Sequence, residues 1–141
     1  MKPLKKSHAV ITIGVIAILT FLVFVCIQKV KNYKTNNKVF DIVENMPEFP
    51  GGEMALRIFI ADSIKYPIEA QEKGIQGKVY IKFVVNKKGE VTNAIVKRGV
   101  DPSLDKEAMR VINILPDWKP GTQDGKNVNV GYTVPILFKL K

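Results

Sequence analysis

The sequence predicts an α+β fold, in which a small three-stranded antiparallel sheet carries two helices on one face and follows a single N-terminal transmembrane helix. Three observations lead to this fold. An uncharged apolar run fills residues 9–27, three later segments alternate apolar with polar residues, and two others repeat apolar residues at helical spacing. A chain of 141 residues has room for one soluble domain after the apolar run.

The apolar run from Ala9 to Ile27 has the length of a membrane-spanning helix. Its 19 residues carry no charge, and as an α-helix they extend about 28 Å, close to the ~30 Å hydrocarbon core of a bilayer. A cleaved signal peptide is the main alternative, but the run is long for one and no small-x-small cleavage site follows it. A lipoprotein site at Cys26 is disfavoured because a branched residue, Val25, precedes it. We therefore expect an uncleaved membrane anchor.

The net charge of +9 belongs mainly to the flanks of this anchor. Residues 1–38 hold seven lysines and no acidic residue, while residues 39–141 hold 15 Lys and Arg against 13 Asp and Glu, a net charge of only +2. Lysines beside a membrane helix meet anionic head groups, so the charge is no argument for nucleic-acid binding. Lysines flank the anchor on both sides, and the positive-inside rule does not orient it. Because a whole domain can be translocated despite nearby charges, we expect residues 1–8 in the cytoplasm and the soluble domain outside.

A polar segment separates the anchor from the soluble domain. Residues 28–44 begin with a stretch rich in Lys and Asn, and we expect a short flexible tether there. A short first strand within residues 39–50 is only weakly indicated. The soluble domain, residues 45–141, has its first clear turn at Gly51-Gly52.

Two helical pieces come first in the soluble domain. A helix over residues 52–65 has apolar side chains at helical spacing, and it ends before Pro67 because a residue that precedes proline avoids the α conformation. The apolar positions are Leu56, Phe59, Ile60 and Ile64. Residues 68–73 add a short helical piece, which Gly74 ends as a left-handed cap.

An antiparallel hairpin and a second helix follow. Residues 78–86 and 90–98 form the two strands of the hairpin, and Gly89 suits the left-handed position of a type I turn with a bulge. Asp101 then caps a helix over residues 102–115. This helix returns the chain, so the last strand runs antiparallel to the first hairpin strand.

The last strand gives the sheet an open edge. Every second residue of 127–140 is apolar, beginning at Val128, which predicts a half-buried strand. Pro135 has no N–H for a ladder, and a proline inside a strand is typical of an edge. A wholly antiparallel sheet then has the order second hairpin strand, first hairpin strand, last strand. An open edge invites another chain to add a strand.

The residues that usually carry catalysis or metal binding are sparse. The one histidine, His8, lies at the membrane boundary, and the one cysteine, Cys26, lies within the apolar run. We therefore expect no enzymatic activity, no metal site and no cofactor. The acids that follow Asp101 are interpreted as a helix cap and first-turn acids. Tyr66 precedes a proline, Trp118 lies two residues from a proline on each side, and both are either core or recognition aromatics, with the core favoured.

The order of motifs resembles the C-terminal domain of the TonB family of energy transducers. The resemblance covers residues 45–140, and each motif is weak alone whereas the ordered set is specific. The motifs are Tyr66-Pro67 and residues 74–85 (GIQGKVYIKFVV), 88–91 (KGEV), 99–105 (GVDPSLD), 118–121 (WKPG) and 132–138 (YTVPILF). Residues 49–52 (FPGG) resemble a variant group within the family.

The resemblance implies a function as well as a fold. It implies a single-pass protein of the bacterial inner membrane, whose periplasmic domain binds a short TonB-box-like segment of an outer-membrane receptor by strand addition. It also implies force transmission from a proton-driven motor similar to the ExbB/ExbD complex. By position, the expected partner contacts are Asn127, Asn129, Val130, Gly131, Tyr132, Thr133, Val134, Pro135, Leu137, Tyr66 and Pro67.

A membrane-tethered periplasmic interaction module without force transmission is the alternative function. Two features favour it. The expected tether is short, and no histidine lies within the apolar run, where the family typically carries one. Open strand edges also make a homodimer compatible with the sequence.

Overall fold

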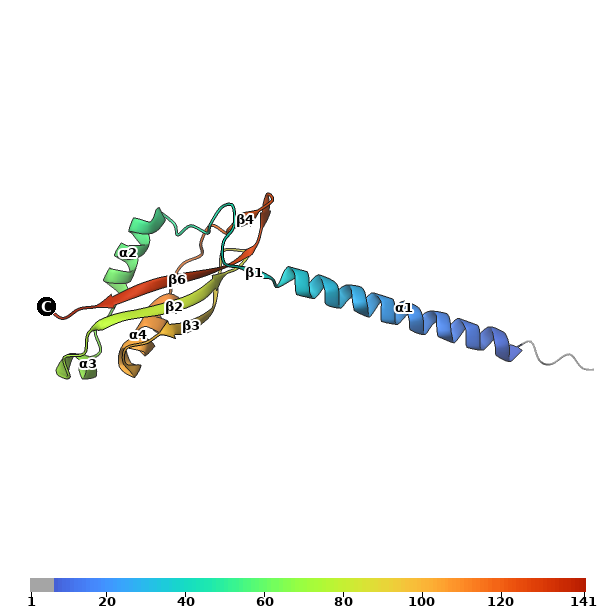
Figure 1. The fold of residues 1–141 in the computed structure, drawn as a ribbon, viewed down its shortest axis with the longest axis horizontal. Helices are drawn as coiled ribbons and strands as arrows, with labels where there is room; N and C mark the ends of the chain where they lie inside the picture. The colour runs from blue at the N-terminus through green and yellow to red at the C-terminus, as the bar shows by residue number, and fades with distance from the viewer. Residues whose placement is uncertain (1–6) are drawn as a thin grey trace, which may run out of the picture. The chain divides into compact units, whose positions relative to one another are not determined.

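The computed structural model describes residues 7–141, which divide into two units between Lys38 and Val39. The first unit is α1 (Ser7–Asn36), a single continuous helix (Figure 1). Within the described residues, one stretch, Thr12–Lys34, is long and apolar enough to span a membrane. This stretch overlaps the span expected at residues 9–27. The expected cytoplasmic segment, residues 1–8, lies almost wholly outside the described residues.

The flexible tether expected at residues 28–44 is wrong over most of its length. α1 continues to Asn36, and Val39–Phe40 forms strand β1 of the second unit, so two residues join the helix to the strand. The Asn45 N–H donates to the Thr122 carbonyl at 3.2 Å, which fixes the end of the segment to the domain. Lysine and glutamine are good helix formers. The polar composition that predicted a flexible segment is therefore equally compatible with an exposed helix.

The sheet of the second unit has four strands instead of the expected three. β2 (Gly77–Val85) and β3 (Val91–Arg98) form the expected hairpin, and β6 (Asn129–Phe138) pairs with the other side of β2. The predicted order of these three strands, β3-β2-β6, is confirmed. The fourth strand is β1, which pairs in parallel with the first two residues of β6. A two-residue strand has no alternation to detect, which is why the sequence indicated it only weakly.

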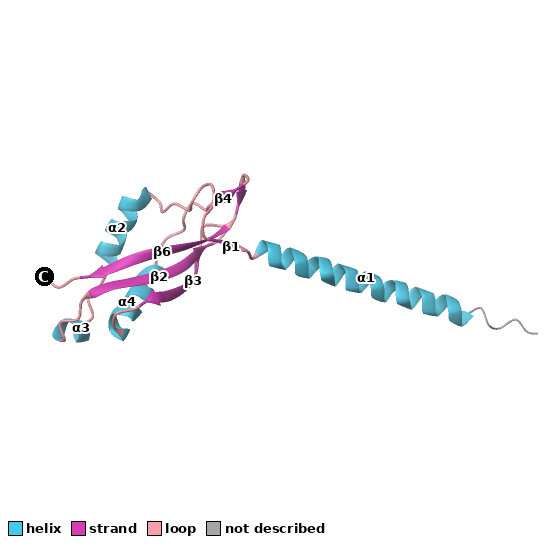
Figure 2. Cartoon of the chain, viewed as in Figure 1, coloured by secondary structure: helices cyan, strands magenta, loops and turns pink. Residues whose placement is uncertain are grey.

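Two helices pack on one face of this sheet, as expected. α2 (Gly52–Ser63) and α4 (Pro102–Asn113) contribute their apolar stripes to the same core, while α3 (Ile68–Glu72) is a single short turn. Figure 2 shows these helices beside the strands of the sheet. The expected cap of α4 is present, because the Asp101 carboxylate accepts from the N–H of Ser103 at 3.0 Å. The sheet residues of the core are Val79, Ile81, Phe83, Val85, Val134, Ile136 and Phe138.

Trp118 lies in this core, as favoured, and only 4% of it is exposed. Its ring packs edge-on against Phe83 and Tyr132, with centroid distances of 5.6 and 5.0 Å. The backbone N–H of Trp118 donates to the Gly89 carbonyl at 2.7 Å. A Cβ at position 89 would lie 1.9 Å from the Trp118 carbonyl oxygen, and the φ of Gly89 is 86°. Glycine is therefore required here by the close approach of the two segments as well as by the turn.

The last strand is shorter than expected at both ends. Asn127 belongs to a separate small hairpin of β4 (Thr122–Gln123) and β5 (Lys126–Asn127), which turns at Gly125. β6 therefore begins at Asn129 and ends at Phe138, whereas the alternating pattern predicted a strand over residues 127–140. The alternation itself is correct within β6, since Val134, Ile136 and Phe138 are buried.

Candidate partner-binding edge

The edge of β6 that faces away from β2 is mostly open. β2 pairs with β6 from Val130 to Phe138, whereas β1 pairs only with Asn129 and Val130. From Gly131 to Phe138, no strand in the described part of the chain pairs with the far side of β6. We call this stretch the open edge.

Pro135 determines which backbone groups point out of the open edge. It lies opposite Tyr80 of β2, and it has no N–H to give to a ladder. In an antiparallel pair, successive residues alternate between pointing their N–H and C=O at the partner and pointing them away. Pro135 fits the positions that point away, and Thr133 and Leu137 share its orientation. We infer that the N–H groups of Thr133 and Leu137 face outward, ready to pair with an added strand.

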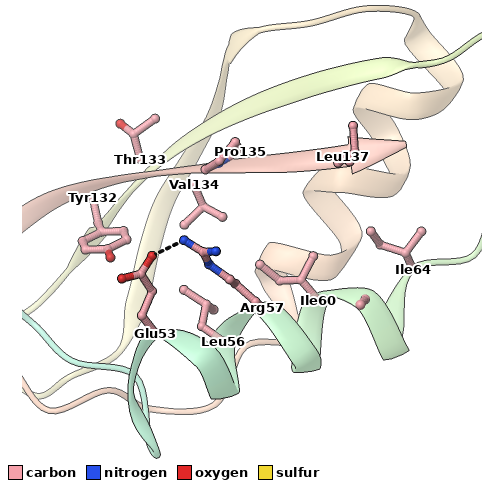
Figure 3. A pocket seen from close by; sticks show the side chains of 11 residues that line it. Glu53, Leu56, Arg57, Ile60, Ile64, Tyr132, Thr133, Val134, Pro135 and Leu137 are labelled. Carbon is pink, nitrogen blue, oxygen red and sulfur yellow. Dashed lines mark hydrogen bonds and ion pairs between the residues drawn. The ribbon is translucent and has the colours of Figure 1, made fainter. Parts of the chain in front are cut away.

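A groove runs beside the open edge, between β6 and α2 (Figure 3). Its volume is about 530 Å³. One wall comes from α2 and the residue that ends it, namely Glu53, Leu56, Arg57, Ile60, Ala61 and Ile64. The other wall comes from β6, namely Tyr132, Thr133, Val134, Pro135 and Leu137. A strand added to the open edge would lie along this groove.

Two charged side chains, Glu53 and Arg57, line the groove. Arg57 and Glu53 form an ion pair of 2.6 Å, one helical turn apart on α2, and the side chains of both are 70% exposed. Such exposed pairs contribute little to stability and remain free to rearrange. Burial, and to a lesser extent the negative charge of Glu53, raise the pKa of Tyr132 above its ordinary value. The Tyr132 hydroxyl therefore stays neutral at physiological pH, and it can donate to a partner.

Most of the second unit matches a known protein family. A family model described as the Gram-negative bacterial TonB protein C-terminal matches residues 62–140. The chain belongs to this family. Protein TonB of Helicobacter pylori (strain ATCC 700392 / 26695) is 29% identical over 89 residues, which are 62% of this chain and 30% of that protein. The chain therefore spans less than a third of the length of that relative.

Two solution structures of the Helicobacter pylori TonB C-terminal domain are also similar to this chain. One is 27% identical with a TM-score of 0.49, and it matches 62% of this chain and 79% of its own. The other is 26% identical with a TM-score of 0.45, and it matches 64% of this chain and 97% of its own. The TonB match begins at residue 62, so β1 and nearly all of α2 lie before it.

Five of the expected partner contacts line the groove at the open edge. Thr133, Pro135 and Leu137 are exposed on the outer face of the sheet, the face without helices. Tyr132 and Val134 point the other way, towards α2 (Figure 3). The alternation of apolar and polar residues therefore predicted correctly which side chains of the open edge point towards the helices and which point to the outer face.

β1 covers the first part of the expected docking edge, at Asn129 and Val130. The Asn127 side chain donates to the Lys87 carbonyl at 3.1 Å, and the Asn129 side chain accepts from the Lys87 N–H at 3.2 Å. Val130 is buried and pairs with Phe40. Gly131 is buried where the open edge begins. The sequence pattern missed this coverage because it comes from segments distant in the chain.

Tyr66 and Pro67 lie apart from the groove. The Tyr66 hydroxyl donates to the carbonyl of Ile75, and its ring packs edge-on against Phe138 with a centroid distance of 5.8 Å. Pro67 is the N-cap residue of α3. Neither residue is among those that line the groove. Their positions are those of residues that support the end of the sheet.

The α2 wall of the groove was missed by the sequence prediction. The helical stripe that includes Leu56, Ile60 and Ile64 was predicted, and the i, i+4 spacing of Glu53 and Arg57 was visible. What the sequence did not show is that this helix lies beside the open edge. No group of three or more His, Cys, Asp and Glu side chains that could hold a metal is found among the residues described.

Proposed function

We propose that this chain is a membrane-anchored TonB-like energy transducer whose second unit binds a short extended segment of an outer-membrane receptor. The segment adds as a strand to the open edge of β6. The single observation that carries the proposal is an unpaired strand edge, Gly131–Phe138, in a domain of the TonB family. Main-chain hydrogen bonds supply the affinity in this mode of binding, and alternate side chains supply the specificity.

The outward N–H groups of Thr133 and Leu137 support this mode of binding. They flank Pro135, so an added strand would find one donor on each side of the proline. The neighbouring groove gives the side chains of the added strand a place to lie. The expected contacts Tyr132, Val134 and Pro135 then complete the binding edge.

The membrane arrangement is part of the same proposal. The helix Thr12–Lys34 anchors the chain in the inner membrane as a single pass, with residues 1–8 in the cytoplasm and residues 45–141 in the periplasm. Support comes from the length and apolar character of the helix and from a family named for Gram-negative bacteria. Force would come from a proton-driven complex of the ExbB/ExbD kind.

A second function is favoured by the short connection between the two units. Four residues separate Lys34 from Val39, which is at most roughly 18 Å of fully extended chain. The partner segment therefore has to come to the domain, because the connection adds little reach. This short reach favours a tethered module that holds a periplasmic partner without transmitting force.

Photo-crosslinking in intact cells tests the proposal and separates the two functions. A photo-reactive side chain at position 133 keeps the backbone N–H and lies on the exposed side of the open edge. The control is the same side chain at position 95, which is exposed on β3 at the opposite edge of the sheet.

An outer-membrane receptor captured from position 133 and not from position 95, with capture changed by an uncoupler, is the expected result. Capture that is insensitive to the uncoupler favours the tethered module. Capture of that receptor from position 95 alone would contradict binding at the open edge.

A further inference from the structure

We propose that the groove beside the open edge selects a partner strand with apolar side chains on one face and acidic side chains on the other. This inference rests on the proposed strand addition and adds the chemistry of the segment that binds. A strand paired with β6 continues the pleat of the sheet, so its side chains alternate between the α2 side and the outer face.

The side chains that point towards α2 meet an apolar surface. Leu56 and Ile60 are buried in the core and form the floor of the groove, with Val134 beside them. Ala61 and Ile64 continue this surface towards the end of the helix. Of the charged pair, Glu53 lies beside Tyr132 at the other end of the groove, and Arg57 extends beneath Val134 (Figure 3). Apolar side chains at successive inward positions would cover the part of this surface that remains exposed, chiefly Ala61 and Ile64.

The side chains that point to the outer face meet positive charge. Lys82 lies opposite Thr133, and Lys78 lies opposite Leu137. One strand, β6, therefore separates each lysine from the added segment. Lysine side chains are long enough to reach across the small Thr133. The ion pair of Lys82 with Asp41 is 3.3 Å long, and its aspartate side chain is 80% exposed, so a partner carboxylate can compete with Asp41 for the lysine.

The neighbouring strand adds to this positive charge. Arg98 of β3 lies opposite Tyr80 of β2, on the same outer face. Lys97 lies with Lys82 beside the surface at Thr133. Acidic side chains on the outward positions of the partner complement this face, whereas basic side chains would be repelled.

The preference for apolar side chains on the inward face would come from a part of this chain that lies before the matched family region. Residues 62–140 carry the TonB match, and the apolar floor of the groove comes from α2, which begins ten residues earlier at Gly52. Leu56, Ile60 and Ala61 therefore lie outside the match. A partner that pairs with β6 alone needs only backbone groups, while a partner that also fits α2 needs the alternating pattern.

Selection from a displayed library of random 12-residue peptides tests the inference. The target is the full chain in lipid nanodiscs, as wild type and as four variants. Ala61→Trp fills the groove from an exposed position, and Asp62→Trp is its matched control, since Asp62 is exposed and does not line the groove. Thr133→Pro removes an outward N–H of the open edge. The double variant Lys78→Glu with Lys82→Glu reverses the charge of the outer face.

Wild type and Asp62→Trp are expected to enrich peptides in which apolar and acidic residues alternate. Affinity for an enriched peptide should fall at least tenfold with Ala61→Trp, and the lysine double variant should lose the preference for acidic residues. A second test needs no variant of the chain. Replacing the apolar residues of that peptide with threonine should lower its affinity for wild type by a similar factor. Circular dichroism shows whether each variant remains folded.

The failure of this inference differs from the failure of the proposed function. Strand addition is wrong if wild type enriches no peptide, or if neither Thr133→Pro nor methylation of the peptide backbone nitrogens weakens binding. Strand addition stands and only the inference is overturned in a different case. In that case Thr133→Pro and backbone methylation abolish binding, while Ala61→Trp binds the enriched peptide as tightly as wild type does and the threonine peptides bind as tightly as the enriched peptide. Enrichment of an apolar pattern with no acidic residues overturns the assignment of the outer face.

Discussion

The contact between Gly89 and Trp118 gives a prediction with a built-in control. Gly89 and Gly125 both have positive φ angles, 86° and 70°. A Cβ at position 89 would lie 1.9 Å from the Trp118 carbonyl oxygen, whereas a Cβ at position 125 meets nothing within 4 Å. Alanine at either position bears the same kind of backbone strain. Only alanine at position 89 would also displace the backbone at Trp118.

The size of the effect follows from these contacts. The left-handed conformation of an alanine costs about 1–2 kcal/mol, and this term is common to both variants. Gly89→Ala also breaks the 2.7 Å hydrogen bond from Trp118 to the Gly89 carbonyl, which costs about 0.5–1.5 kcal/mol. Displacing a well-packed segment costs about 1–3 kcal/mol more. We expect Gly89→Ala to lower the free energy of unfolding by about 2–4 kcal/mol more than Gly125→Ala.

Urea unfolding of the full chain in detergent micelles measures this difference. Trp118 is the one tryptophan of the sequence, and its fluorescence reports on the environment that the substitution disturbs. Because Trp118 packs against Tyr132, Gly89→Ala should also disturb the groove. Equal destabilisation of the two variants, within about 0.5 kcal/mol, would refute the close approach of Gly89 to Trp118.

Three further variants test the core, the charges and the edge. Phe83→Ala should destabilise the domain by about 3–5 kcal/mol in the same unfolding assay, because Phe83 is fully buried; Val84→Ala, on the outer face, should cost clearly less, and equal costs would place Phe83 outside the core. The Arg110 guanidinium holds the pKa of Glu107 below its ordinary value, so this carboxylate contributes stability above pH ~4 that is lost as the pH falls through its folded pKa. Glu107→Gln should therefore be less stable than wild type at pH 7, and the difference should shrink as the pH is lowered below about 4; a gap independent of pH would argue against that pair. Thr133→Pro should leave the unfolding midpoint nearly unchanged while it weakens partner binding, and unfolding of the variant would show that the Thr133 N–H faces β2.

Much of the fold was predictable because its signals are local. The alternation in β6, the cap at Asp101 and the turn at Gly89 each depend on neighbouring residues. Pro135 predicted the edge position because a proline removes a donor wherever it stands. These features led to the correct order of β2, β3 and β6.

The remaining features depend on contacts between distant segments. β1 consists of two residues that pair in parallel with β6 ninety positions later, and no periodicity marks so short a strand. The polar residues after the membrane helix are compatible with either a helix or a flexible tether. α2 was predicted as a helix, but its position beside the open edge is set by packing of Leu56 and Ile60 in the core. The groove therefore became visible only in the structure.

The central claim is that the open edge of β6 accepts a strand, and amide hydrogen exchange tests it most directly. In the free chain, the amides of Val134 and Ile136 should exchange slowly because they pair with β2, whereas those of Thr133 and Leu137 should exchange fast. Addition of a peptide enriched on the wild-type chain should slow exchange at Thr133 and Leu137 and leave the other two unchanged. Peptide binding that leaves Thr133 and Leu137 unprotected, or protection of both before any peptide is added, would contradict the claim.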